Sequence, residues 1–412
     1  MPCDGASGLR GTPPSDRQPR RMTMSTLSYS DDTVRTGKPL IFAMAAASGV
    51  AVANIYYNQP MLGLMTASFP GSGATSMIPT ATQLGYALGL LMLVPLGDKF
   101  ERRRLIVWQF LLLALASVLA ALAPSAPVLL VASVLIGVGA TVAQQIVPVA
   151  ATVASEGQRG AVVGTVMSGL LSGILLSRTL AGLVADAAGW RAMFWLSVPL
   201  ALAGAALMGR MLPVLPPSSA LSWRSLMRSL LTLWRAEPAL RRATWIQGAL
   251  FASFSAFWSI LALYLASGSH PLGAAAAGLF GVIGVAGITA APVAGRLADR
   301  IGSRPVILLG ALLTLLAWGV FGLWGAVAGL IVGVILLDLG VQSALIAHQH
   351  VIYGLQPTAR GRINTLFMGG MFLGGALGSS GAMAAWQAGG WMPVTLFAGG
   401  VTLLALVAAS RR

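Results

Sequence analysis

The chain has 412 residues, of which 56% are hydrophobic and 9% are charged, and its formal net charge is +15. So little polar surface cannot cover a soluble globule of this size, and the composition therefore indicates a membrane protein. The basic excess does not indicate nucleic-acid binding, because the basic residues lie in loops between apolar segments and form no stripe with interleaved aromatic residues.

Residues 1–38 are polar and rich in Pro, Ser and Arg, with no apolar signal-peptide region and no helical periodicity. They are expected to form a disordered cytoplasmic tail, and Met22 or Met24 is an alternative start. The single cysteine, Cys3, lies in this tail, so the sequence predicts neither a disulfide framework nor a cysteine metal site.

The remaining apolar runs predict an all-α integral membrane protein with twelve transmembrane helices, at roughly 20 residues per span. The first six are expected at 39–64, 77–97, 104–123, 127–150, 161–185 and 191–211. The last six are expected at 243–266, 273–296, 304–324, 326–348, 362–386 and 391–410. Residues 212–242 are predicted to be a basic, partly amphipathic linker between a bundle at 39–211 and a bundle at 243–412.

The positive charges predict the orientation of these spans. Of the 26 Lys and Arg residues, 24 lie in the termini, the linker and the loops after spans 2, 4, 8 and 10. These segments all lie on one side, whereas the opposite loops carry only Arg191, beside Asp186. Both termini are therefore expected to be cytoplasmic.

The two halves align with each other at one constant shift of 201 residues, as the pairs Asp98 with Asp299 and Gly139 with Gly340 illustrate. One shift across six spans indicates a duplicated six-helix unit. Because six is even, the repeats are parallel, and a solute site is expected between them near the middle of the membrane.

Polar side chains are concentrated on a few of the predicted spans. Spans 3, 6, 9 and 12 are almost wholly apolar and are predicted to face lipid. Stripes of polar residues occur on spans 1, 4 and 10: Asn54, Tyr57 and Asn58; Thr141, Gln144 and Gln145; Asp338 and Gln342. They are predicted to face a central hydrated cavity, and the alternative is that the amides only join helices to one another.

Two ionisable residues, Arg178 on span 5 and Asp338 on span 10, lie well inside the predicted spans. Each is costly there unless it is paired or hydrated, so each is a candidate functional residue. Arg178 is suited to an anionic group or a coupling carboxylate, and Asp338 to a proton or a cation. The structural alternative is a buried ion pair or a carbonyl-capped Arg. His348 and His350 lie near the end of span 10. They are either pH-sensing residues or ordinary residues of a solvated helix end.

The loop after span 2 and its repeat resemble the signature loop of the major facilitator superfamily, G-x-x-x-D-[RK]-x-G-[RK]-[RK]. The two copies read Gly97-Asp98-Lys99-Phe100-Glu101-Arg102-Arg103-Arg104 and Gly295-Arg296-Leu297-Ala298-Asp299-Arg300-Ile301-Gly302-Ser303-Arg304. The resemblance spans residues 39–412. The run from Asn54 to Pro60 and the run from Gly173 to Asp186 are similar to the bacterial arabinose-efflux-permease-like branch, whose members are assigned to solute or drug export.

The resemblance implies that the Asp of the loop accepts hydrogen bonds from a neighbouring helix N-terminus and from an Arg, as a latch that keeps one face closed. The gating residues are then Asp98, Arg102, Asp299 and Arg300. Ordinary cytoplasmic charge that serves topology is the alternative.

Several positions depart from the family pattern. Val94 and Glu101 stand where the first loop copy should have Gly, and the run on span 5 lacks the Gly-Pro pair of the antiporter motif. Ser133 replaces the Arg that many proton-coupled drug exporters carry on span 4, and span 1 has no acidic residue. Proton coupling therefore has to use another residue, and Asp338 is the best candidate.

The sequence thus predicts a monomeric, proton-coupled secondary active transporter of the bacterial inner membrane, which exports a small drug, sugar or metabolite by alternating access. No cofactor or metal is implied. The expected solute contacts are Asn54, Tyr57, Gln145, Arg178, Trp258, Asp338 and Gln342, with Trp258 chosen as the repeat mate of Tyr57. An uptake permease or facilitator of the same fold is the alternative. A membrane enzyme lacks a catalytic constellation in this sequence, and a sensor lacks a soluble output domain.

Overall fold

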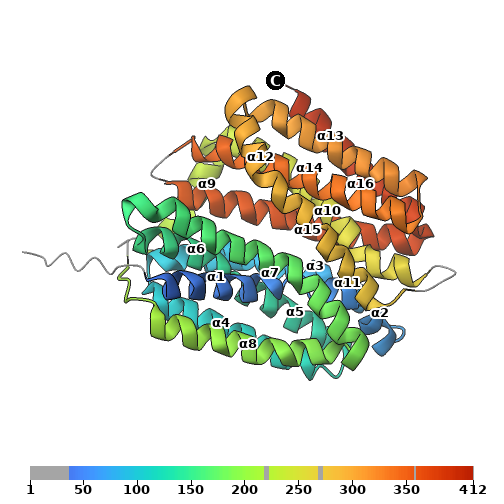
Figure 1. Cartoon of the computed structure of the whole chain (residues 1–412), viewed down its shortest axis with the longest axis horizontal. Coiled ribbons are helices and arrows are strands. Elements are labelled where there is room, and N and C mark those ends of the chain that lie inside the picture. Colours follow the sequence, from blue (N-terminus) through green and yellow to red (C-terminus); the bar gives the residue numbers. More distant parts are fainter. Residues whose placement is uncertain (1–36, 218–221, 268–271, 357–358, 412) are drawn as a thin grey trace, which may run out of the picture. The chain divides into compact units, whose positions relative to one another are not determined.

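The computed structural model describes residues 37–411 apart from 218–221, 268–271 and 357–358. The predicted tail is therefore almost wholly outside the described residues. In the described part the chain forms helices joined by short connections (Figure 1).

The helices of the first half alternate in direction through six spans. Their bounds are α1 Lys38–Ala53, α2 Asn58–Ser68, η1 Thr75–Met77, α3 Ile78–Met92, η2 Pro95–Asp98, α4 Arg102–Ala121, α5 Ala126–Ala140, α6 Val142–Val153, η3 Glu156–Gln158, α7 Arg159–Ala188 and α8 Trp190–Met211. Here α1 and α2 together form span 1, and α5 and α6 form span 4.

The linker and the second half continue the pattern. Their bounds are α9 Trp223–Ala236, α10 Pro238–Ala266, α11 Ala274–Ile283, α12 Val285–Ile301, α13 Ser303–Leu323, α14 Val327–Tyr353, α15 Arg360–Gly389 and α16 Trp391–Ser410. The predicted amphipathic linker is the helix α9, which buries Leu226, Leu230 and Leu233 along one face. These positions recur every three or four residues, as an amphipathic helix requires.

Among the described residues, eleven helical stretches are long and apolar enough to cross a membrane. The remaining predicted span is span 8. It is divided at Gly284 into the short apolar helix α11 and the helix α12, so it is not among the eleven. The expected arrangement of twelve helices is confirmed, with a break in span 8 that hydropathy does not reveal.

A second break divides span 1 at residues 54–57. Pro60 lacks an N–H group, and its ring clashes with the carbonyl four residues earlier, on Tyr56. The N–H groups of Ile55, Tyr56 and Gln59 accordingly bond three residues back rather than four. The chain therefore makes a tight turn between α1 and α2, and Tyr56 and Tyr57 lie on it.

Spans 3, 6, 9 and 12 are α4, α8, α13 and α16, and α4 packs on α8 as α13 packs on α16. Their outer faces expose large apolar side chains, among them Trp108, Leu115, Leu316 and Leu404. Such faces are stable in contact with lipid, as predicted for these four spans.

Polar and basic segments that are distant in sequence meet at one end of the helices. Arg103 Nη1 donates to the carbonyl of Leu212 over 3.4 Å, which joins the start of α4 to the end of α8. Arg242, at the start of α10, donates to the carbonyl of Ala408 at the end of α16 over 3.1 Å. We call this end the basic end, and the end at which α7 finishes and α11 begins the opposite end.

The two halves pack against each other through few helices. Contacts between them join α2 to α10 and α11, α7 to α11, and α3 to α15. In Figure 1 these pairs lie where the blue to green helices meet the yellow to red ones. The α7–α11 contact lies towards the opposite end, and there the backbones approach closely because both helices carry glycine.

Candidate functional site

Arg178 lies in the middle of α7 and is buried, with 4% of its surface exposed. Its Nε donates a 2.8 Å hydrogen bond to Oε1 of Gln59 on α2. Its Nη2 has no hydrogen-bond partner among the residues described. A guanidinium has five N–H donors, so this buried group retains capacity to bind an acceptor.

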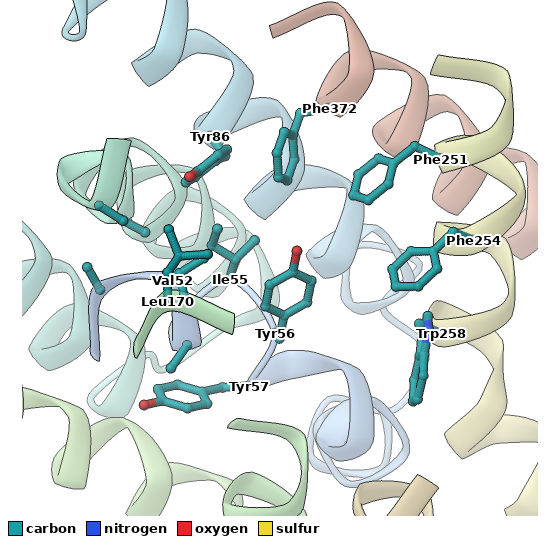
Figure 2. Packing of buried hydrophobic residues seen from close by; sticks show 14 of the residues in the cluster. Val52, Ile55, Tyr56, Tyr57, Tyr86, Leu170, Phe251, Phe254, Trp258 and Phe372 are labelled. Carbon is teal, nitrogen blue, oxygen red and sulfur yellow. The ribbon is translucent and has the colours of Figure 1, made fainter. Parts of the chain in front are cut away.

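Three aromatic rings surround the guanidinium of Arg178, and we call them the aromatic cage. The Arg178 Cζ lies 4.0 Å from the ring centroid of Trp258, 4.5 Å from that of Tyr56 and 5.8 Å from that of Phe254. Trp258 and Phe254 come from α10 and Tyr56 from the turn in span 1 (Figure 2). Each cation–π contact in a dry site contributes up to about 2 kcal/mol.

Asp338 lies on α14 and is also buried, with 5% of its surface exposed. In the described part of the chain its Oδ1 has no hydrogen-bond partner at normal distance, and the indole of Trp258 interacts with this carboxylate. The three ion pairs found there do not join Asp338 to Arg178. The two charged side chains are therefore not a closed structural salt bridge.

Two glycines of span 8 lie against the charged residues: Gly281 is next to Arg178 of α7, and Gly284 is next to Asp338 of α14. A Cβ on Gly281 would lie 3.0 Å from Cβ of Arg178, and one on Gly284 would lie 2.6 Å from Oδ2 of Asp338. A side chain at Gly281 would press on Arg178, and one at Gly284 would displace the carboxylate of Asp338. The end of α11 and the break that follows it thus lie between the two charged residues, which belong to different halves.

The site is closed in this structure. The space between Gln59, Arg178, Trp258 and Ala277 is too small for a water molecule. A solute can enter only if the helices around Arg178 move apart, as alternating access requires.

Of the predicted solute contacts, the structure brings Arg178 and Trp258 together, but it places Tyr56 rather than Tyr57 on the guanidinium. Figure 2 shows the two tyrosines projecting to different sides of the turn in span 1. An uninterrupted helix would place Tyr57 on the face of Asn54, and the turn removes that relation. The proline at position 60 is the sequence signal from which the turn could have been anticipated.

Asn54 lies within the first half, away from Arg178. Its Nδ2 donates to the carbonyl of Val50, and its Oδ1 accepts a 2.6 Å hydrogen bond from Ser197 of α8. Ser197 lies 3.1 Å from Ser117 of α4. The amide therefore joins three helices, which is the alternative role considered for these residues.

Gln145 and Gln342 are also separated from the aromatic cage. Gln145 donates from Nε2 to the carbonyl of Leu93 over 2.8 Å and lies against Gly97, so it supports the loop at the basic end. Gln342 is half-buried on α14, one turn beyond Asp338. In the part of the chain that the structure describes, Gln342 makes no hydrogen bond to Arg178.

The predicted gating residues differ between the two loop copies. Arg102 donates from Nη2 to Asp98 over 3.0 Å and from Nε to the carbonyl of Gly97. A cavity of about 140 Å³ lies between this loop, α6 and the start of α15. In the second copy Asp299 lies 3.6 Å from Nδ1 of His350, and Arg300 is exposed.

Asp186 was not among the predicted site residues, yet it links the two halves at the opposite end. Its carboxylate accepts hydrogen bonds from the backbone N–H groups of Ala274 over 2.9 Å and Ala275 over 3.0 Å. It thereby caps the N-terminus of α11, where a negative charge is stabilised. No signal in the sequence connects residue 186 with residue 274.

Apolar spans, duplicated halves and a buried charged site between the halves define a multi-pass α-helical membrane transporter. A family model described as "Major Facilitator Superfamily" matches residues 42–288, which is more than half of the chain. The chain belongs to the major facilitator superfamily.

Known relatives agree with this assignment. The chain is 42% identical to the "Putative uncharacterized transporter YgaY" of Escherichia coli strain K12, over 89% of this chain and 94% of the relative. It is 34% identical to the "Probable transporter SCO4007" of Streptomyces coelicolor, over 97% of this chain and 92% of the relative. The fold is similar to that of the human organic anion transporter MFSD10, with a TM-score of 0.68 and 16% identity over 90% of this chain and 99% of that one.

Proposed function

We propose that this transporter exports a small solute by alternating access, in exchange for protons, across the bacterial inner membrane with its basic end in the cytoplasm. The observation that carries the proposal is the placement of Arg178 and Asp338. Each half contributes one buried ionisable residue, each with a polar atom that lacks a partner in the described region, on either side of the break in span 8. Broken helices at the junction of two repeats are typical of transporter binding sites.

The solute is expected to carry a hydrogen-bond acceptor and a flat apolar part. Arg178 Nη2 supplies a donor, and the rings of Tyr56 and Trp258 supply apolar faces. A donor or cationic group on the same solute would bind the carboxylate of Asp338. Small amphipathic or zwitterionic metabolites and drugs fit this combination.

Competition at Asp338 provides the coupling. A proton and a donor group of the solute both require the same carboxylate, so binding of one disfavours binding of the other. A buried carboxylate without either would be costly, because burial penalises the charged form. The transporter therefore changes conformation with the solute bound in one direction and with a proton bound in the other.

A flux assay tests this mechanism. Purified protein is reconstituted in liposomes that contain a pH-sensitive dye, a proton gradient is imposed, and candidate solutes are screened for coupled proton movement. Wild type is compared with Asp338→Asn, and with Glu156→Gln as a control that removes an acid outside the membrane-spanning helices.

Proton flux that begins with a solute, persists in the control and is lost in Asp338→Asn is the expected result. Solute movement that ignores both the gradient and Asp338→Asn would contradict proton coupling. Protons and solute moving in the same direction would instead indicate an uptake permease of the same fold.

A further inference from the structure

A cavity of about 410 Å³ lies at the basic end of the second half, away from the aromatic cage. We call it the second-half cavity. Six of its nine lining residues are apolar, and the other three can donate hydrogen bonds or carry positive charge. The apolar residues are Ala239, Ala243, Ile246, Ile307, Val351 and Ala409, and the polar ones are Arg242, Arg304 and His348.

Comparison with the repeat mates in the first half shows which cavity residues have a structural role in both halves and which occur only in the second half. Arg304 donates to the carbonyl of Ser410, as its repeat mate Arg103 donates to the carbonyl of Leu212. Both halves therefore use this arginine to bind the end of their last helix. The position of Arg304 in the cavity is explained by the fold alone.

Arg242 and His348 have no such counterpart. At the shift of 201 residues, Ile41 stands in the place of Arg242 and Val147 in the place of His348. The first half thus forms the same bundle with apolar residues at both positions. A six-helix bundle of this kind therefore forms without polar groups at these two positions, although Arg242 also donates to the carbonyls of Ala408 and Ala409 at the end of α16.

The volume of the cavity is also particular to the second half. Ala409 lines it, whereas the repeat mate of Ala409 is Met208, which is fully buried in the first half. A methionine side chain is three heavy atoms longer than that of alanine. The small residue leaves space that the first half fills.

His348 retains binding capacity. It is 2% exposed, and its Nδ1 lies 2.8 Å from the carbonyl of Ala344 and 3.1 Å from Oε1 of Gln247. Its Nε2 has no hydrogen-bond partner among the described residues. A buried polar atom without a partner is costly, so a ligand that supplies one is stabilised.

The location favours a lipid. Trp245 follows Arg242 by three residues on α10 and is 71% exposed, as expected of an aromatic side chain at the boundary between lipid and water. Ile246, one turn from Arg242, lines the cavity. Arg242 thus lies between the membrane boundary and an apolar cavity.

We propose that the second-half cavity binds an anionic phospholipid of the leaflet at the basic end. The lipid phosphate would accept hydrogen bonds from Arg242 and Arg304 and neutralise part of the basic end. The apolar walls would contact the glycerol and the first methylenes of an acyl chain. Basic pockets between membrane helices commonly bind such headgroups.

Native mass spectrometry of the delipidated, full-length protein tests the proposal, with dioleoylphosphatidylglycerol as the probe and dioleoylphosphatidylcholine as the neutral comparison. The variants Arg242→Ile and Ala409→Met each install the residue that the first half already carries, so the fold is expected to accept them. The control Arg210→Ile removes one exposed arginine from the basic end of the first half.

The expected result is preferential retention of the anionic lipid by wild type and by the control. Arg242→Ile should bind it about fivefold more weakly, since one basic residue near the membrane surface contributes about that factor. Ala409→Met should also weaken binding, because its longer side chain fills space in the cavity. If either variant binds like wild type, the second-half cavity is not the site. If the neutral lipid binds equally, the site does not select an anionic lipid and the assignment is wrong. If inorganic phosphate alone displaces the anionic lipid, the assignment is also wrong, and the cavity is a site for a free anion.

Discussion

The environment of Arg178 combines a costly charge with favourable local contacts. Its guanidinium is buried, donates a hydrogen bond to Gln59 and contacts the aromatic cage. Cation–π contacts offset part of the cost of removing the charge from water, but they do not replace a carboxylate partner. A residue of this kind is expected to reduce stability and to be retained for function.

Replacing Arg178 by methionine tests that balance. Arg178→Met removes the buried charge and keeps most of the side-chain volume, so the melting temperature is expected to rise by about 2 to 4 °C while transport is lost. Thermal unfolding in one detergent measures the shift.

Arg191→Met is the matched control for this change. Arg191 also stacks on a ring, that of Trp190 at 4.2 Å, and donates to the carbonyl of Ala123, but it is only half-buried. Its loss should leave the melting temperature unchanged or lower it. A melting temperature that falls in Arg178→Met would show that Arg178 is mainly structural.

The neighbouring tyrosines allow a second test at the scale of residues. Tyr56→Leu removes a ring 4.5 Å from the guanidinium, whereas Tyr57→Leu removes a buried ring that faces elsewhere. For a solute found in the flux screen, transport per folded protein should fall about tenfold in the first variant and about twofold or less in the second. Equal losses in both variants would mean that the cage does not bind the solute.

At the scale of elements, the breaks in spans 1 and 8 determine what the site contains. The turn at 54–57 directs Tyr56 towards α10, and the break at Gly284 makes room for Asp338. Beyond this break, towards the opposite end, α11 approaches α7 through glycine. Thr179 donates to the carbonyl of Gly278 over 3.0 Å, and a Cβ on Gly278 would lie 2.5 Å from the carbonyl oxygen of Arg178.

A single methyl group should therefore disturb the contact between α7 and α11. Gly278→Ala is expected to destabilise the protein by about 1 to 3 kcal/mol, because backbone on both sides has to shift. Gly164→Ala, on the partner helix α7, meets no atom within 4 Å and should stabilise the protein by about 0.5 to 1 kcal/mol. Thermal unfolding of both variants measures the difference, and a stable Gly278→Ala would mean that the helices are less tightly packed than described.

At the scale of the whole molecule, the two halves are held together most closely at the opposite end. Asp186 caps α11 there, and the loop containing Asp98 borders a cavity at the basic end. Opening of the opposite end requires the carboxylate of Asp186 to separate from two backbone N–H groups. The stability of this cap should therefore influence the balance between conformations.

Asp186→Ala removes the cap and should increase the population open at the opposite end by about fivefold, the effect of one charge at a helix N-terminus. Spin labels at Ala188 and Leu272, in a Cys3→Ser background, would report the distance between α7 and the segment before α11. Asp186→Asn keeps one acceptor oxygen and should give an intermediate population. Identical distance distributions in all three proteins would exclude a role for the cap.

Much of this protein is determined by its sequence alone. The number of spans, the repeat, the family and the two buried ionisable residues follow from it, because a membrane requires each span to be apolar and to satisfy its own backbone. Arg178 and Asp338 are conspicuous for the same reason: charge within an apolar run is visible without coordinates. Only the tertiary structure decided which polar residues share a site.

Tyr56 replaces Tyr57 because of a local turn, and Asn54 and Gln145 bind partners within the first half. Asp186 binds a helix 88 residues further along the chain. Such contacts depend on where helices break and on how the two halves pack, and hydropathy and helical periodicity carry no information about either.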